Sequence, residues 1–297
     1  MDRLDAMRLF IRVVERRSFT LAARDIGVPR STATDAVKAL EARLRVRLLQ
    51  RTTRHVAPTL DGEAYYRRCI GIIADVEDAE GAFAGLKPGG LLRVEVQGTL
   101  ARHFLLPGLP DFLERYPAIE LAMSEGERWV DVVREGVDCV LRYGNLPDSD
   151  MVGRRLIMLD RLTCAAPAYL ARHGMPTGID ALEGHRMIGL RSLSTGNLWP
   201  LEFMIDGAIR TVDMPAIVSV TGTESYLAAA RLGLGLFQVP RFHAGADLPE
   251  GRLLPLLVET PPPSVPVSIL WPRNRQLSPR VRVFVDWAVE QFARAQL

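Results

Sequence analysis

The chain has 297 residues, of which 24% are charged and 48% hydrophobic, and its formal net charge at pH 7 is +2. That length suits two or three domains with ordinary cores, and the composition is usual for a globular protein. No apolar run reaches the roughly 18 residues of a membrane span, and the charges in the N-terminal stretch do not fit a signal peptide. The three cysteines form no CxxC pair, so we expect neither disulfides nor zinc, and a cytoplasmic location.

Three helices are predicted in the first 44 residues. The first covers residues 4–15. The second follows Ser18, whose hydroxyl can cap a helix, and ends at Gly27, which tolerates the left-handed conformation. The third covers residues 30–44. Their expected buried positions are Leu9, Phe10, Val13, Val14, Ala22, Ala23, Ile26, Ala33, Val37, Leu40 and Leu44.

The outward face of the third helix carries small polar side chains. At about 100° per residue it collects Ser31, Thr34, Asp35, Lys38 and Ala42. A helix that enters the major groove of DNA needs such a face, because long apolar groups could not hydrogen-bond to base edges. Spacing alone fits a helix-turn-helix and a plain αα-hairpin equally. Charge favours the first, because residues 1–58 hold thirteen Lys or Arg and six Asp or Glu, a local charge of +7.

A short strand-like hairpin is predicted next, at residues 51–56. It carries Arg51, Arg54 and His55, which as a wing beside the third helix would reach phosphates or a narrow minor groove. The alternative is a solvated surface loop.

A long helix is expected from Thr59 to a break at residues 87–90 (KPGG). Its apolar positions alternate in steps of four and three: Tyr65, Cys69, Ile72, Val76, Ala79, Phe83 and Leu86. This heptad seam favours pairing with a second helix. The alternative is an amphipathic helix packed on its own domain. Either way Cys69 is interpreted as a small buried hydrophobe.

From residue 91 strands and helices alternate, which predicts a mostly parallel sheet covered by helices. Strands are expected at 91–98, 119–126, 137–144, 161–167, 186–191, 212–220, 233–240 and 267–272, and a helix at 128–135. Thr221 and Glu224 match a capping box, and a last helix opens at Ser278-Pro279. Two such units, with the end of the chain returning to the first, predict a two-lobed ligand binder.

Ligands of such sheets bind at the carboxyl ends of strands. Candidate effector-binding residues are Thr99, Ser124, Glu125, Arg142, Thr195, Asn197 and Thr221. Each alone also fits a cap or turn. Arg142 is the strongest candidate, since a cation at the end of a buried strand suits an anionic effector, but it fits a structural ion pair equally.

The first sixty residues resemble the LysR-type transcriptional regulators. The matching residues are Phe10, Ser18, Phe19, Ala22, Ala23, Leu40, Glu41, Leu44, Leu48, Arg51, Arg54, Thr59 and Gly62. Residues 138–144, 166–174 and 232–240 look like the effector-binding domain of that family, so the resemblance covers the whole chain.

The resemblance implies an α plus α/β protein. It places a winged helix-turn-helix at residues 1–58, a linker and dimerisation helix at 59–87, and at 88–297 an effector domain that resembles periplasmic binding proteins. Lobe I would be residues 91–162 with 266–297, and lobe II residues 163–265. Homodimers, usually assembled into tetramers, are also implied.

The base-reading positions of the family fall on Arg30, Ser31, Thr34 and Asp35. The family usually has Gln, Ser and Arg where this chain has Arg30, Thr34 and Asp35. An acid at the groove can accept from cytosine N4 but repels phosphate, so the operator sequence cannot be borrowed from relatives. Arg45 replaces a common helix-ending glycine, which predicts either strain or a longer helix.

The expected function is therefore a transcription factor that binds double-stranded DNA at an interrupted inverted repeat and responds to a small, anionic effector. Lys38, Arg51 and Arg54 would contact phosphates, and RNA polymerase is a further candidate partner. An enzyme, or a solute-binding protein with a basic appendage, is the alternative. However, the sequence contains no nucleophile elbow, phosphate loop, HExxH or clustered metal ligands, so no catalytic residue, metal or cofactor is expected. A nucleoid structural protein would not need a cleft.

Overall fold

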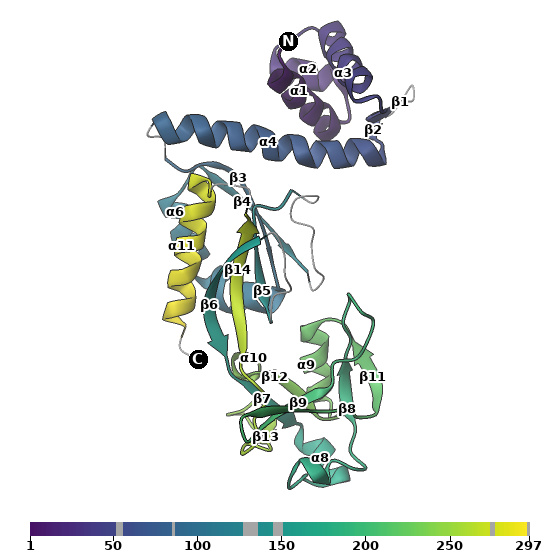
Figure 1. Cartoon of the computed structure of the whole chain (residues 1–297), viewed down its shortest axis with the longest axis vertical. Helices are drawn as coiled ribbons and strands as arrows, with labels where there is room; N and C mark the ends of the chain where they lie inside the picture. Colours follow the sequence, from purple (N-terminus) through teal and green to yellow (C-terminus); the bar gives the residue numbers. More distant parts are fainter. Residues whose placement is uncertain (52–55, 85–86, 127–135, 145–150, 274–276, 296–297) are drawn as a thin grey trace.

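The computed structural model describes residues 1–51, 56–84, 87–126, 136–144, 151–273 and 277–295, without the side chains of residues 51, 75 and 77–84. A small helical domain is followed by a long helix, and below this helix the two lobes lie one after the other along the long axis of the molecule (Figure 1). The helical domain consists of α1 (Arg3–Arg16), α2 (Phe19–Ile26), α3 (Arg30–Leu44), β1 (Leu49–Arg51) and β2 (Val56–Pro58).

Local sequence sets the ends of the first three helices. The Ser18 hydroxyl accepts a hydrogen bond from the Leu21 N–H at 3.3 Å, and Gly27 ends α2 with φ 75°. Helix α3 has the predicted bounds. It does not run on past Leu44, because Arg45 takes the left-handed conformation with φ 56°, which is strained for a side chain with a Cβ. The predicted caps and the strain at Arg45 are therefore confirmed.

The core of the helical domain contains the predicted residues Leu9, Phe10, Val13, Ala22, Ala23, Ala33, Val37 and Leu40, and Val14 packs against it while half-buried. The prediction is wrong for Ile26 and Leu44, each of which is 37% exposed. Each is the last residue of its helix, and the buried positions of α2 and α3 end about one turn earlier.

Helix α4 (Leu60–Ala84) directly follows Thr59. The Thr59 Oγ1 accepts from the Gly62 N–H at 2.9 Å, and the hydroxyl donates to the Arg47 carbonyl at 2.7 Å. The first turns of α4 pack on their own domain, because Tyr65, Cys69 and Ile73 join the core of the helical domain.

The two halves of the predicted heptad seam on α4 therefore have different outcomes. Its N-terminal part follows the alternative of packing within the chain, and Ile73 rather than Ile72 is buried there. Ile72 is 39% exposed. The side chains of Ala79, Phe83 and Leu86 lie outside the described part of the chain, so a partner helix on the second half of α4 stays a prediction.

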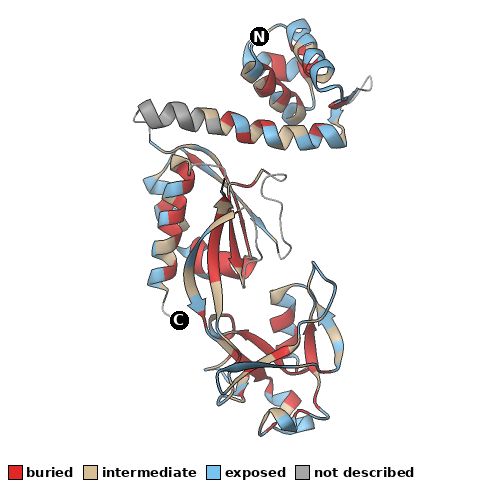
Figure 2. Cartoon of the chain, viewed as in Figure 1, coloured by how far each residue is buried: buried red, intermediate tan, exposed pale blue. Residues whose placement is uncertain are grey.

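Lobe I is built on a five-stranded sheet in the order β4-β3-β5-β14-β6. Its strands are β3 (Gly90–Val96), β4 (Ile119–Glu125), β5 (Cys139–Tyr143), β6 (Met151–Leu159) and β14 (Val265–Pro272). Its helices are α5 (Gly98–Leu100), α6 (Leu109–Arg115) and α11 (Pro279–Arg294), with a π-helical and a 3-10 turn at Ala101–Leu105 and Leu106–Gly108. The stripe of Val281, Val285, Ala288 and Phe292 on α11 is buried against this sheet, as predicted (Figure 2).

Lobe II contains three small sheets: β12-β7-β13, β11-β8 and β10-β9. Its strands are β7 (Arg161–Ala165), β8 (Met187–Leu190), β9 (Leu201–Ile205), β10 (Ala208–Val212), β11 (Ala216–Val220), β12 (Phe237–Pro240) and β13 (Leu254–Leu256). Its helices are α8 (Pro167–His173), α9 (Thr223–Arg231) and α10 (Arg241–Ala244), with a 3-10 turn at Ile179–Ala181. The region predicted as one strand at 212–220 is instead the end of the β9–β10 hairpin, a turn, and β11.

Two segments cross between the lobes. Strand β6 runs directly into β7, and the chain returns from β13 into β14, which pairs with β6 (Figure 1). Strand β14 is antiparallel to both β5 and β6, and β7 is antiparallel to both of its neighbours. The prediction of mostly parallel strands is therefore correct for β3, β4 and β5 in lobe I and for β8 and β11 in lobe II. It is wrong for the crossing strands and their partners, because the returning strands reverse direction. The helix predicted at 128–135 lies outside the described residues.

Within the described residues, no helix combines the length and the apolar character that crossing a membrane requires.

Candidate DNA-reading face and effector cleft

The outward face of α3 is open to solvent. Arg30, Ser31, Asp35 and Lys38 are exposed, whereas Ala33, Val37 and Leu40 on the opposite side are buried. Thr34 is half-buried, and its hydroxyl donates to the Arg30 carbonyl at 3.0 Å, one turn back along the helix. Because the hydroxyl proton is used in this bond, the Thr34 oxygen can accept a further hydrogen bond but cannot donate one.

A buried connection ties the predicted wing to α3. The Glu41 Oε1 accepts from the backbone N–H groups of Leu48 and Leu49, at 2.9 and 3.1 Å. Strands β1 and β2 then form the expected antiparallel pair. The loop between them holds Arg54 and His55, which lie outside the described residues, as does the side chain of Arg51. The structure thus places the base of the wing against the end of α3.

A cavity of about 390 Å³ lies between the two lobes. Of the candidate residues, the structure brings Thr99 and Arg142 from lobe I together with Thr221 from lobe II along its lining. Tyr143, Trp199, Leu201, Tyr226, Val239 and Phe242 add a largely apolar wall. Volume and composition are those of a small-molecule site.

Four candidates lie outside the lining of this cavity. The Ser124 hydroxyl donates to the Val94 carbonyl at 3.4 Å, within the lobe I sheet. Glu125 pairs with Arg102 at 3.0 Å. Thr195 and Asn197 are exposed in the loop after β8, where the Asn197 N–H donates to the Thr195 hydroxyl at 3.3 Å. That loop still contributes to the cleft, but through Ser192, Leu193 and Ser194.

Arg142 forms the structural ion pair that the sequence left open. Its Nη2 lies 2.6 Å from the Glu95 Oε1, and both side chains are almost fully buried. Its Nη1 also donates to the Gly126 carbonyl at 3.5 Å. Arg142 therefore faces the cleft with its charge already balanced.

A second ion pair lines the cleft on the lobe II side. Arg161 Nη1 lies 2.6 Å from Glu202 Oε2, and Arg161 Nη2 donates to the Gln238 Oε1 at 3.4 Å. The Gln238 Nε2 in turn donates to the Thr163 hydroxyl and the Glu202 carbonyl, at 3.0 and 2.7 Å. These polar groups are thus satisfied by one another.

One ionic cluster joins the lobes directly. Arg102 in lobe I pairs with Glu125 of its own lobe and, through Nη2 at 3.1 Å, with Glu224 of lobe II. His243 Nε2 lies 3.5 Å from the same Glu224 carboxylate. Glu224 does not complete a capping box, because α9 begins at Thr223 and has no side-chain cap. The capping-box prediction is wrong because Glu224 reaches across to lobe I instead.

Comparison with known proteins now decides the family. The family model described as "Bacterial regulatory helix-turn-helix protein, lysR family" matches residues 4–63. The family model described as "LysR substrate binding domain" matches residues 86–293. The chain is a LysR-type transcriptional regulator. It binds DNA through the N-terminal domain and carries an effector-binding regulatory domain, so it is a regulator and not an enzyme.

Relatives of this LysR-type regulator match along its whole length. It is 35% identical to the HTH-type transcriptional regulator YhjC of Escherichia coli K12, covering 97% of each chain. It is also 35% identical to an HTH-type transcriptional repressor of Pseudomonas aeruginosa UCBPP-PA14, covering 99% of this chain and 93% of the relative. The structure of CrgA, a LysR-type regulator from Neisseria meningitidis, matches with 31% identity and a TM-score of 0.61 over 97% of this chain and 98% of that one.

Sequence reasoning missed the lobe-joining residues of this LysR-type regulator. Arg102 lies just after the strand predicted at 91–98, and His243 lies just after the strand predicted at 233–240, and neither was a candidate. The ion pairs of Arg102 and Arg161 join residues 122 and 41 positions apart. No local pattern signals such a pairing, since only the tertiary fold brings the partners together.

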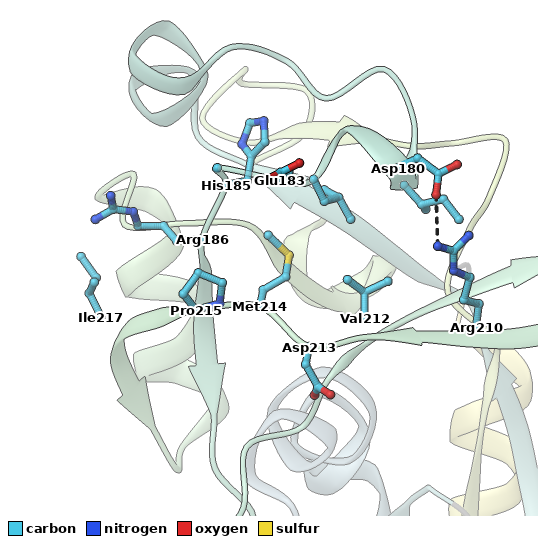
Figure 3. Close-up of a pocket in the computed structure, with 13 residues that line it drawn as sticks. Asp180, Glu183, His185, Arg186, Arg210, Val212, Asp213, Met214, Pro215 and Ile217 are labelled. Carbon is cyan, nitrogen blue, oxygen red and sulfur yellow. Dashed lines mark hydrogen bonds and ion pairs between the residues drawn. The ribbon is translucent and has the colours of Figure 1, made fainter.

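The LysR-type regulator also has an open hollow of about 640 Å³ on lobe II, which shares no lining residue with the cleft. Figure 3 shows Asp180 and Arg210 facing each other at one end of it, with an ion-pair distance of 3.0 Å. Pro215, Met214 and Val212 lie between Arg186 and Arg210 in that view. Although larger, this hollow holds none of the candidate effector residues.

Proposed function

We propose that this regulator reads its operator with the outward face of α3 lying in the major groove. The observation that carries the proposal is the solvent-exposed polar face over a buried apolar one. In the described part of the chain, neither Asp35 nor Lys38 has an ion-pair partner, so both charges are free to meet DNA.

The side chains suggest distinct roles. Arg30 matches the O6 and N7 acceptors of guanine, and Asp35 matches the N4 donor of cytosine. The Ser31 hydroxyl can donate or accept, whereas Thr34, whose proton is bonded to the Arg30 carbonyl, can accept. Lys38 supplies a phosphate contact, which fixes position without reading sequence. Arg51, Arg54 and His55 extend the phosphate contacts from the wing.

We infer that α4 joins two copies, so that two α3 helices meet two half-sites of an interrupted inverted repeat. The exposed Ile72 and the heptad spacing beyond it support this pairing. Tetramers and a contact with RNA polymerase belong to the same proposal, by likeness to the family. An effector in the cleft acts by shifting the angle between the lobes, and with it the spacing of the DNA-binding domains.

The DNA proposal is tested by measuring affinity for duplex DNA as a function of salt. Replacing Lys38 with Ala should weaken binding to all sequences about equally and reduce the slope of log K against log salt by about one. Arg12→Ala is a matched control, because Arg12 is an exposed cation of the same domain that pairs with Glu15 at 3.0 Å. Equal effects of the two substitutions, or none, would remove α3 from the interface.

A further inference from the structure

We infer that the effector of this cleft is a molecule without net charge that has a planar, aromatic body. The inference rests on the proposed function, in which an effector binds between the lobes. It differs from the anionic effector that Arg142 suggested in the sequence.

The arginines that face the cleft are already neutralised. Glu95 balances Arg142, and Glu202 balances Arg161, each at 2.6 Å. An anion would have to draw one of these arginines from its carboxylate and leave that carboxylate poorly solvated, which strongly disfavours binding. A cation would have to draw Glu95 or Glu202 from its arginine and leave that arginine without a counter-charge, which disfavours binding in the same way.

The remaining arginine on the lining, Arg191, follows the last residue of β8 and is exposed to solvent. Its guanidinium donates to the Gly196 carbonyl at 2.5 Å and to the Ser219 hydroxyl at 3.2 Å. Neither partner lines the cleft.

The other ionisable groups of the lining are neutral at pH 7. Burial raises the pKa of Tyr143 and of Tyr226 to about 12, so both phenols keep their protons. Burial also lowers the pKa of His243, although Glu224 acts in the opposite direction. Apart from the exposed Arg191, the cleft therefore presents balanced charges, uncharged aromatic rings and the hydroxyls of Thr99 and Thr221.

Trp199 indicates the shape of the ligand. It lines the cleft yet is 58% exposed, and a large aromatic side chain left open beside a cavity is suited to stacking on a planar ligand. A threonine hydroxyl can donate one hydrogen bond and accept up to two. A ligand with an aromatic ring can stack on Trp199, and an uncharged carbonyl, amide or hydroxyl on that ring can form hydrogen bonds with the threonine hydroxyls.

The test uses the full-length protein and two probes that differ only in charge, 2-naphthamide and 2-naphthoate, with binding measured by calorimetry and by tryptophan fluorescence. The amide should bind at least tenfold more tightly than the carboxylate. Glu202→Gln keeps the shape of the side chain but uncovers the charge of Arg161, so it should improve carboxylate binding about tenfold and change amide binding less than twofold.

Asp180→Asn is the matched control. It also removes a carboxylate paired with an arginine, Arg210, but in the outer hollow, so both probes should bind as they do to the wild type. Carboxylate binding equal to or tighter than amide binding in the wild type would overturn the inference, as would a failure of both probes to bind at 1 mM.

Trp199→Ala separates this inference from the proposed site. It should weaken the amide at least fivefold. An amide that binds with the expected preference but is insensitive to both Trp199→Ala and Glu202→Gln would lie outside the cleft, which would overturn the proposed effector site itself.

Discussion

Two side chains near the end of α3 shape the DNA-binding domain at the scale of single residues. Arg45 ends the helix in a left-handed conformation that favours glycine, and Glu41 fastens β1 through two backbone N–H groups. The strain at Arg45 was predictable, because a residue with a Cβ stands where a helix usually ends in glycine. The role of Glu41 was not, because its partners lie seven and eight residues away, across a turn.

Arg45→Gly should stabilise the N-terminal domain by about 1 kcal/mol, because glycine adopts the left-handed region without steric cost. The free energy of unfolding from urea titrations measures this. Arg43→Gly, two residues earlier and within α3, should instead destabilise by about 1 kcal/mol. A loss of stability in Arg45→Gly would mean that its side chain makes contacts worth more than the strain.

At the scale of elements, α4 contributes to a core that its heptad pattern did not identify. Its first turns complete the core of the DNA-binding domain through Tyr65, Cys69 and Ile73. Cys69 is fully buried and burial raises the pKa of its thiol to about 11, which fits a packed hydrophobe. Spacing predicted the buried stripe of α4 but not which body it packs against, because an intramolecular and an intermolecular helix contact need the same pattern.

Ile72→Glu, alone or with Val76→Glu, should convert dimers to monomers in sedimentation, because a charge buried in a helix pair costs several kcal/mol unless it is paired. Leu60→Glu is the control: Leu60 lies on the same helix, is 87% exposed, and should tolerate the charge. Intact dimers of the Ile72 variants would place the interface elsewhere.

The two lobes form the whole-molecule scale, and their contact is the part that the sequence could least predict. The α/β character, the returning C-terminal helix and the place of the cleft followed from strand and helix signals. The reversed crossing strands did not, because strand direction depends on the path of the chain between the lobes. The ion cluster of Arg102, Glu224 and His243 did not either, since its members come from separate elements of both lobes.

Three histidines with lowered pKa values make the lobes sensitive to acid. Burial lowers the pKa of His243 and of His185 from 6.5, and partial desolvation lowers that of His103, which is exposed. The folded state therefore binds fewer protons than the unfolded state below pH 6.5, so stability is full above that pH and falls as the pH drops through it. The carboxyl pKa of Glu224 is also lowered, since the pairing with Arg102 and His243 outweighs burial, but it acts below pH 4.5.

Melting temperatures at pH 7.5, 6.5 and 5.5 test this dependence. We expect a decline toward pH 5.5 that is smaller in His243→Gln, whose side chain cannot take up a proton. A melting temperature that stays constant or rises over that interval would show that the histidines are not shielded in the folded lobes.

The central claim is that the exposed side of α3 reads bases. Selection of binding sites from random duplex DNA, by the wild type and by Asp35→Ala in parallel, tests it most directly. The account predicts an interrupted inverted repeat for the wild type and, for the variant, a changed base preference at one symmetry-related pair of positions. The same motif bound by both proteins, with only a uniform loss of affinity in the variant, would contradict it.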